Sequence, residues 1–193
     1  MARPREFETD TALEHAMQVF WEYGYKDASL PDLLEGMGLT RGSLYKAFKD
    51  KKNLFLLALD RYETAHVDAA ADHLRDRSLG DGRTRIVTLF VGLVGAVSAG
   101  DHRGCLLCTA ASGAAADDAE IAKVVHQGLA KMQEALSDAI ADIADIPTRD
   151  HQTLANVLLT QYIGLRMLAR SRLPLGILEQ AADGVEKILD GAT

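Results

Sequence analysis

Apolar residues recur at a helical period along almost the whole chain. In the first segment, the i, i+3, i+4 and i+7 positions of one helix face are held by Leu13, Ala16, Met17 and Phe20. This spacing predicts a helix over residues 8–23, and Gly24 supplies a left-handed stop. No alternating strand pattern occurs in the sequence, so we predict an all-α fold.

Two short helices joined by a tight turn follow the first helix. Ser29 can cap the earlier one, with Asp32 three residues later in a capping-box position. Gly38 can adopt the positive φ that the turn requires, and Thr40 can cap a second short helix over Arg41–Phe48. Two helices joined by a three- or four-residue turn that contains glycine are typical of a helix-turn-helix.

The rest of the chain reads as longer helices. Asp50 can cap a helix that runs from Lys51 into the seventies. Residues 86–97 are apolar on nearly every side, which predicts a helix buried between neighbours. Further helices are predicted over residues 104–112, 117–144, 149–171 and 175–190. We therefore expect about nine helices, with a three-helix helix-turn-helix domain over residues 1–53 and a helical bundle domain over residues 54–193.

Composition supports a folded protein without membrane spans. The chain has 193 residues, of which 48% are hydrophobic and 25% charged, so a disordered chain is excluded. No apolar run approaches the roughly 18 residues of a membrane helix, and the first residues contain no apolar signal region. We expect a cytoplasmic location.

Net charge first argues against nucleic acid, but its distribution along the chain reverses that argument. The formal net charge is −7, whereas phosphate neutralisation requires Lys and Arg. Residues 1–53 hold eight basic and nine acidic residues, and residues 54–193 hold thirteen and nineteen. Between Arg41 and Lys52, five residues are basic and one is acidic. Charge alone leaves two interpretations open, a solvated helix face and a nucleic-acid contact.

The motifs around this basic segment resemble those of TetR-family transcriptional repressors. The similarity covers about the first 55 residues. It comprises the Phe-x-x-x-Gly-Tyr end of the first helix (Phe20 to Tyr25), the capped second helix, Thr-Arg-Gly-Ser-Leu-Tyr from Thr40, and Lys-x-x-Leu-Phe from Lys51. The remaining residues match the family only in length and helical layout. The resemblance implies a ligand- or stress-responsive repressor that binds a palindromic operator in double-stranded DNA as a homodimer.

A recognition helix presents its first turn to base edges, while neighbouring donors hold phosphates. Here Arg41 and Lys46 are the best candidates for such contacts, and the resemblance assigns phosphate contacts to Tyr45 and Lys51. The candidate DNA-binding residues are Ser29, Thr40, Arg41, Gly42, Ser43, Tyr45, Lys46 and Lys51. Two positions depart from the family pattern: Ala47 stands where His is usual, and Lys52 replaces a common acidic residue.

The resemblance also assigns two roles to the second domain. The last two helices would form a four-helix bundle with a second copy, although their apolar stripes could also pack within their own domain. The predicted interface residues are Val157, Leu158, Gln161, Leu165, Leu168, Leu178, Ala182, Val185 and Leu189. An effector pocket, suited to a small apolar molecule, would be lined by Leu59, Tyr62, Phe90, Leu93, Val94, Cys105, His126, Met132, Tyr162 and Met167, each of which could equally be ordinary core.

The two cysteines form a Cys-x-x-Cys pair, Cys105 and Cys108. A zinc site would need two more suitably spaced ligands, so we expect no metal, and a reducing cytoplasm disfavours a disulfide. A helix start beside His102 and Arg103 would favour a Cys105 thiolate. The surrounding segment resembles a subgroup of TetR-type regulators that includes sensors of electrophiles or oxidants. Two interpretations remain open, a sensing thiol at Cys105 and two buried core residues.

Two other function classes are weighed against the regulator. The sequence contains no phosphate-binding glycine loop, nucleophile elbow or metal-binding helix motif, so we expect neither an enzyme nor a cofactor. A helical adaptor that binds only protein would explain the acidic surface, but it would not explain the segment from Thr40 to Lys52.

Overall fold

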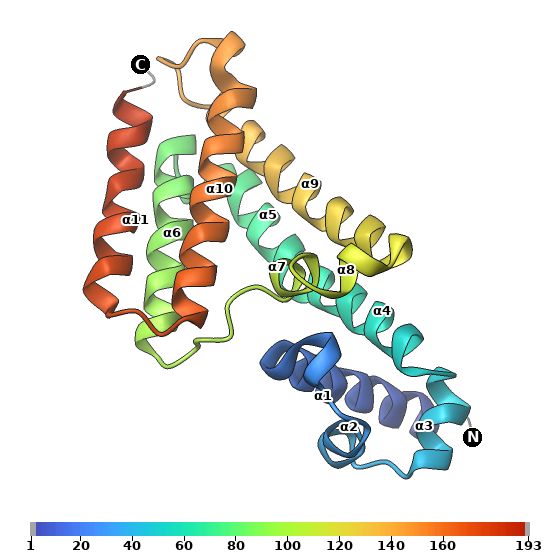
Figure 1. Cartoon of the computed structure of the whole chain (residues 1–193). Coiled ribbons are helices and arrows are strands. Elements are labelled where there is room, and N and C mark those ends of the chain that lie inside the picture. The colour runs from blue at the N-terminus through green and yellow to red at the C-terminus, as the bar shows by residue number, and fades with distance from the viewer. Residues whose placement is uncertain (1–2, 192–193) are drawn as a thin grey trace. The chain divides into compact units, whose positions relative to one another are not determined.

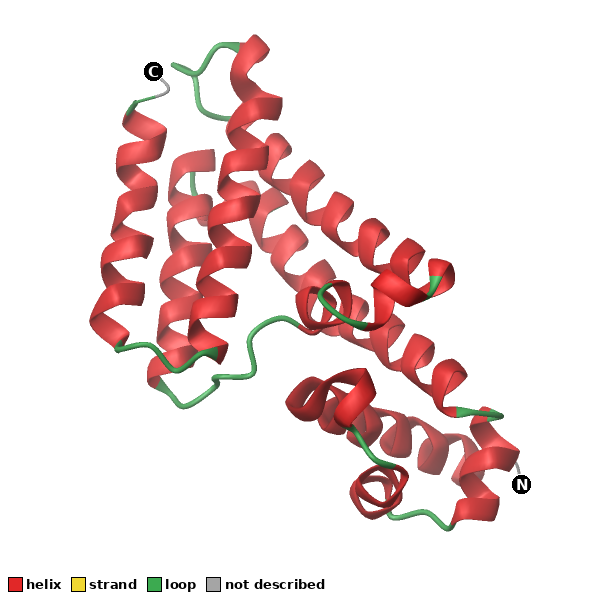
Figure 2. Ribbon diagram, in the orientation of Figure 1, coloured by secondary structure: helices red, strands yellow, loops and turns green. Residues whose placement is uncertain are grey.

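The computed structural model describes the backbone of residues 3–191 and the side chains of residues 9–114 and 117–191. Its described residues form helices and connecting loops, with no strand among them (Figure 2). The α-helices are α1 (Arg3–Asp27), α2 (Leu30–Met37), α3 (Arg41–Phe48), α4 (Lys51–Tyr62), α5 (Ala69–Arg75), α6 (Gly82–Ser98), α7 (Leu106–Ala111), α8 (Ala114–Asp117), α9 (Ala119–Ala141), α10 (His151–Arg170) and α11 (Leu175–Asp190).

Helix α4 continues into α5 through a π-helical segment, Glu63–Asp68. If α4 to α5 is taken as one helix and the single turn α8 is set aside, nine helices remain over residues 3–191. The all-α prediction and its count of about nine helices are confirmed. Helix α1 begins at Arg3, earlier than the predicted residue 8.

The chain divides into two compact units. The first contains the residues up to Ala65 together with Leu106–Gln127, and the second contains His66–Cys105 and the residues from Gly128 onward. Figure 1 shows the elements of each unit along the colour ramp. Because α7, α8 and the start of α9 belong to the first unit, that unit is larger than a helix-turn-helix alone.

The first unit is built around α1, which packs against α2, α4 and α7. Its core is aromatic: the Phe20 and Phe55 rings lie 4.9 Å apart, and Trp21 meets Tyr62 edge-on at the same distance. Leu44 of α3 is also buried. Burial of Leu44 and Phe48 holds α3 on the unit through one apolar side, which leaves its other sides available to solvent.

The second unit places α6 against α5, α10 and α11. Figure 1 shows α6, α10 and α11 running side by side. The prediction that the 86–97 helix is buried on nearly every side is wrong for its outer side, because Val91 is 55% exposed. The buried side of α6 carries Phe90, Leu93 and Val97 at helical spacing.

A buried arginine joins three segments of the second unit. Arg85, in α6, is 1% exposed and donates to the Leu74 carbonyl oxygen at 2.5 Å and to Asp142 Oδ2 at 2.5 Å. Asp142 also accepts from Arg77 Nη2 at 2.5 Å. These hydrogen bonds, led by the one from Arg85, hold the pKa of the Asp142 carboxyl below its ordinary value. The sequence signal for this network is weak, because the start of α6 carries two arginines, Arg83 and Arg85, and only Arg85 is buried.

No helix among the described residues is both long enough and apolar enough to cross a membrane.

Candidate DNA-binding surface

Capping interactions fix both helices of the helix-turn-helix. Ser29 Oγ accepts from the Asp32 backbone N–H at 3.3 Å, and the Asp32 carboxylate accepts from the Ser29 N–H at 2.9 Å, which completes the predicted capping box. Gly38 ends α2 with φ 63°, a left-handed conformation that suits glycine. Thr40 caps α3, as predicted, by accepting from the Ser43 N–H at 3.3 Å.

The exposed sides of α3 carry most of the candidate DNA-binding residues. Arg41, Gly42, Ser43, Tyr45 and Lys46 are all exposed, and no atom lies within 4 Å of a Cβ placed on Gly42. The Arg41 guanidinium lies 5.7 Å from the centre of the Tyr45 ring, so the two side chains lie together. The structure thus gathers five candidates on one short helix.

The remaining three candidates have structural partners. Ser29 and Thr40 act as helix caps, and their hydroxyls bond to Asp32 and Ser43. Lys51 Nζ donates to the Lys26 carbonyl oxygen at 3.4 Å and lies 5.0 Å from the centre of the Tyr25 ring. Burial against these groups lowers the pKa of Lys51, although the nearby Asp27 carboxylate opposes that shift.

Two lysines near this surface are paired with acidic residues. Lys52 Nζ lies 2.8 Å from Asp118 and 2.9 Å from Glu120, and Lys26 Nζ lies 3.0 Å from Asp117. The hydrogen bonds to Asp118 and Glu120 raise the pKa of Lys52. Lys52 places a positive charge where the family commonly has an acidic residue, but these ion pairs offset that charge.

The predicted effector-pocket residues are divided between the two units. Leu59 and Tyr62 lie in the core of the first unit, whereas Phe90 and Tyr162 meet edge-on at 5.7 Å in the second. The remaining buried members are Leu93, Val94, Cys105 and Met132. A hollow of about 30 Å³ beside Leu93, also lined by Gly104 and Arg166, has room for about one water molecule.

Two predicted pocket residues, His126 and Met167, are exposed rather than part of the core. His126 directly follows Val125 on α9 and therefore points about 100° away from the buried face that Val125 and Met132 share. Met167 is 37% exposed, because α10 turns Leu165 and Ala169 inward instead.

Six of the nine predicted interface residues lie in the core of the second unit. They are Leu158, Leu165, Leu178, Ala182, Val185 and Leu189. A side chain already buried in its own chain adds no area to an interface, so the prediction is wrong for these six. The cause is that α11 packs its apolar stripe on α6 and α10. Val157 is exposed, and Gln161 and Leu168 are partly exposed.

Cys105 and Cys108 are both buried and reduced. Cys105 immediately precedes α7, which begins two residues later than the predicted helix start at residue 104. Arg103, expected to favour a thiolate there, is paired with Asp101 at 2.9 Å. Among the described residues, no group of three or more His, Cys, Asp or Glu side chains is placed to hold a metal ion.

Comparisons with known proteins match this architecture. The family model "Bacterial regulatory proteins, tetR family" matches residues 12–58. The Escherichia coli HTH-type transcriptional repressor ComR is 47% identical over 60 residues, which are 31% of this chain and 29% of ComR. The uncharacterized Bacillus subtilis regulator YezE is 27% identical over 98% of this chain and all of its own length.

A solved structure extends the similarity to the whole fold. It contains a cysteine mutant of the TetR-family transcriptional regulator CifR with a 26-bp double-strand operator DNA. CifR is 30% identical to this chain, the match covers 95% of this chain and 96% of CifR, and the TM-score is 0.78. Proteins of this kind are transcriptional regulators rather than enzymes, and the adaptor alternative has no support. The chain belongs to the TetR family of DNA-binding transcriptional regulators.

Proposed function

We propose that this protein is a repressor that binds a palindromic operator as a homodimer and is released from it by a small effector. The observation that carries the proposal is the exposed polar and basic face of α3, held by capped turns on an aromatic core. The operator complex of CifR supports the same assignment for this chain. We further propose that residues 1–53 read DNA and that residues 54–193 respond to the effector and dimerise.

Each exposed group on α3 can make a defined contact. Arg41 can donate two hydrogen bonds to a guanine edge, and the Tyr45 hydroxyl, on a side chain that is 42% exposed, can donate to a phosphate. Gly42 leaves the backbone open to close approach. Base contacts select the sequence, whereas phosphate contacts set the position of the helix on the duplex.

Removing these groups should separate the two kinds of contact. We expect Arg41→Ala to weaken operator binding by about tenfold and to relax sequence preference at one base pair. Tyr45→Phe should weaken binding by less than Arg41→Ala does, and by the same factor for all sequences. The measurement is gel shift at fixed salt, with a duplex selected from a random pool. Tyr23→Phe is the matched control, because Tyr23 is an exposed tyrosine of α1. Unchanged affinity in both α3 variants would overturn the proposal.

The exposed side of α10 and α11 supports the dimer. Val157 and Ile177 are each 45% exposed, and Ala181, Gly184 and Ile188 continue the partly exposed side of α11 at helical spacing. Gln161 Nε2 donates to the Ala181 carbonyl oxygen at 3.0 Å and ties the two helices together on this side. We propose this side, rather than the buried stripes, as the surface that meets a second copy.

A charge placed on this side should break the dimer. We expect Val157→Glu to shift the protein to monomer, because an unpaired carboxylate would be buried between the copies. Sedimentation equilibrium measures the shift, which should be at least tenfold in the dissociation constant. Val91→Glu is the matched control, since Val91 is an exposed valine of α6. Dimers of equal strength in both variants would contradict the proposed surface.

We propose that the effector is a small apolar molecule bound in the second unit near Phe90, Leu93 and Tyr162. The hollow beside Leu93 has room for about one water molecule, so an effector at that hollow would require it to widen. Such a ligand lowers DNA affinity only if it binds that arrangement more tightly than the DNA-competent one.

Reaction of Cys105 with an electrophile or oxidant is the alternative means of release. Its place immediately before α7 supports a reactive thiol, and CifR, a relative of known structure, was solved as a cysteine mutant. Against it stand the burial of Cys105 and the pairing of Arg103 with Asp101. We therefore place it second to a non-covalent effector.

A further inference from the structure

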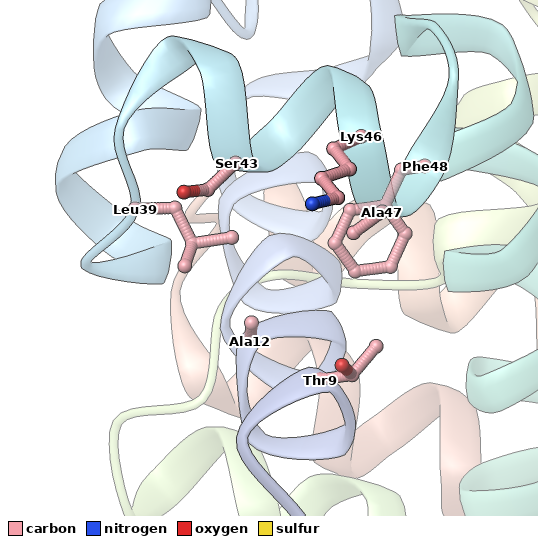
Figure 3. Close-up of a pocket in the computed structure, with 7 residues that line it drawn as sticks. All are labelled: Thr9, Ala12, Leu39, Ser43, Lys46, Ala47 and Phe48. Carbon is pink, nitrogen blue, oxygen red and sulfur yellow. The ribbon is translucent and has the colours of Figure 1, made fainter. Parts of the chain in front are cut away.

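An open groove of about 510 Å³ lies between α1 and α3 in the first unit. It is lined by Thr9, Ala12, Leu39, Ser43, Lys46, Ala47 and Phe48. Figure 3 shows Ser43 and Lys46 on the α3 side of the groove and Ala12 and Thr9 on the α1 side. The volume suits a group the size of a small organic ligand, since such sites occupy about 300 to 1,000 Å³.

The lining combines an apolar floor with a cationic and hydroxylic rim. Ala12 and Phe48 are buried below, whereas Thr9, Ser43 and Lys46 are exposed. None of the seven described lining residues carries a carboxylate, and among the described residues no ion pair holds Lys46. A matching occupant has an apolar body and an anionic group. A deoxyribose phosphate has this chemistry, because its sugar ring carries C–H groups and its phosphate carries the charge.

The groove is continuous with the DNA-facing side of α3. Ser43 and Lys46 belong both to the groove and to the exposed side proposed above to meet DNA. A DNA backbone that passes α3 could therefore enter the groove without a change of direction. A separate ligand in the groove would instead compete with DNA for the same two side chains.

We propose that this groove receives the sugar–phosphate backbone of the bound DNA. Lys46 neutralises the phosphate, the hydroxyls of Thr9 and Ser43 donate to it, and the sugar lies on Ala47 and Phe48. Thr9 thereby becomes a DNA contact supplied by α1, outside the helix-turn-helix. The inference rests on the proposed function, since it requires α3 to face DNA.

The test compares two threonines of the same helix. Thr9→Val removes the groove hydroxyl but keeps the shape of the side chain, and Thr11→Val removes an exposed hydroxyl that does not line the groove. On the selected duplex, we expect Thr9→Val to weaken binding by about fivefold, with an unchanged salt dependence, and Thr11→Val to have no effect. Ala47→Leu should weaken binding further, because the added methyl groups fill the groove.

Lys46→Met tests the charge. The slope of log affinity against log salt is negative, and its magnitude should decrease by about one per subunit, as expected when one phosphate contact is lost. Thermal melting of each variant checks that the fold is retained. If Arg41→Ala and Tyr45→Phe weaken binding whereas Thr9→Val and Ala47→Leu do not, the groove assignment is wrong and the proposed function stands. If none of the four weakens binding, the proposed function fails as well.

A second experiment tests whether the groove binds the DNA backbone or a free phosphate ester of the same chemistry. Thymidine 5′-monophosphate is titrated against the protein without DNA and followed by calorimetry. We expect no binding at millimolar concentration, because a single nucleotide lacks the neighbouring contacts of a duplex. Saturable binding that Ala47→Leu abolishes would identify a site for free phosphate esters and would overturn the DNA-backbone assignment.

Discussion

Asp142→Asn should lower the free energy of unfolding by about 3 kcal/mol, because it leaves the charge of Arg85 buried without its counter-ion. Arg85 is almost wholly buried, and its remaining hydrogen bonds go to backbone carbonyl oxygens, which carry no formal charge. Arg77 would lose a partner at the same time, but it is largely exposed and contributes little. Urea unfolding followed by circular dichroism measures the loss.

Asp138→Asn is the matched control for this prediction. Asp138 pairs with Arg75 at 2.7 Å, but 57% of the Asp138 side chain and 40% of the Arg75 side chain are exposed. A surface pair of this kind contributes about 0 to 1 kcal/mol. If both variants lose the same free energy of unfolding, the burial of Arg85 does not determine how much its ion pair with Asp142 contributes.

The same carboxylate makes this stability depend on pH. Arg85 lowers the pKa of Asp142 in the folded state, so its stabilisation is present above the unfolded value of about 3.9. It is lost as pH falls through the lower folded pKa. The difference between wild type and Asp142→Asn should therefore be constant at neutral pH and shrink below about pH 4. A difference that persists in full at pH 2 would exclude the carboxylate as its source.

Gly82→Ala should destabilise the second unit by about 3 kcal/mol or prevent its folding. A Cβ on Gly82 would lie 1.8 Å from the Ala139 carbonyl oxygen and 2.9 Å from the Ala139 carbonyl carbon. Both are backbone atoms, so no side-chain rotation relieves the contact, and α6 and α9 must move apart. The overlap outweighs the gain of about 1 kcal/mol that alanine brings inside a helix. Thermal melting measures the effect, and soluble yield replaces it if the variant does not fold.

Gly92→Ala is the control that separates the steric effect of an added Cβ from the effect of alanine on helix stability. Gly92 lies in the same helix, is exposed, and has no atom within 4 Å of an added Cβ. It should raise the melting temperature slightly, because alanine stabilises a helix interior. Stabilisation by both substitutions would show that the close approach of α6 to Ala139 does not restrict residue 82.

The helix-turn-helix was predictable because its signals are local. The caps at Ser29 and Thr40 and the turn at Gly38 depend on residues at most three positions away, and the structure shows each one. The exposure of Arg41 and Tyr45 followed from the burial of Leu44. Periodicity alone also located the later helices, although it gave a later start for α1.

The errors concern which face of a helix meets which neighbour. An apolar stripe on α11 reads the same whether it packs on its own chain or on a partner, and α6 covers it here. His126 was misplaced by a rotation of one residue along α9. The groove between α1 and α3 and the pairing of Lys52 with Asp118 join residues at least 27 positions apart, and no local pattern encodes such contacts.

The pairing of Lys26 and Lys52 with acidic residues reduces the number of counterions that this chain can release from DNA on binding. A cation already paired within the protein displaces few counterions from a duplex, so it adds little entropy of ion release on binding. The basic segment therefore acts through fewer charges than its five Lys and Arg residues suggest. More of the affinity must then come from hydroxyl groups and from the fit of α3, which salt screens far less.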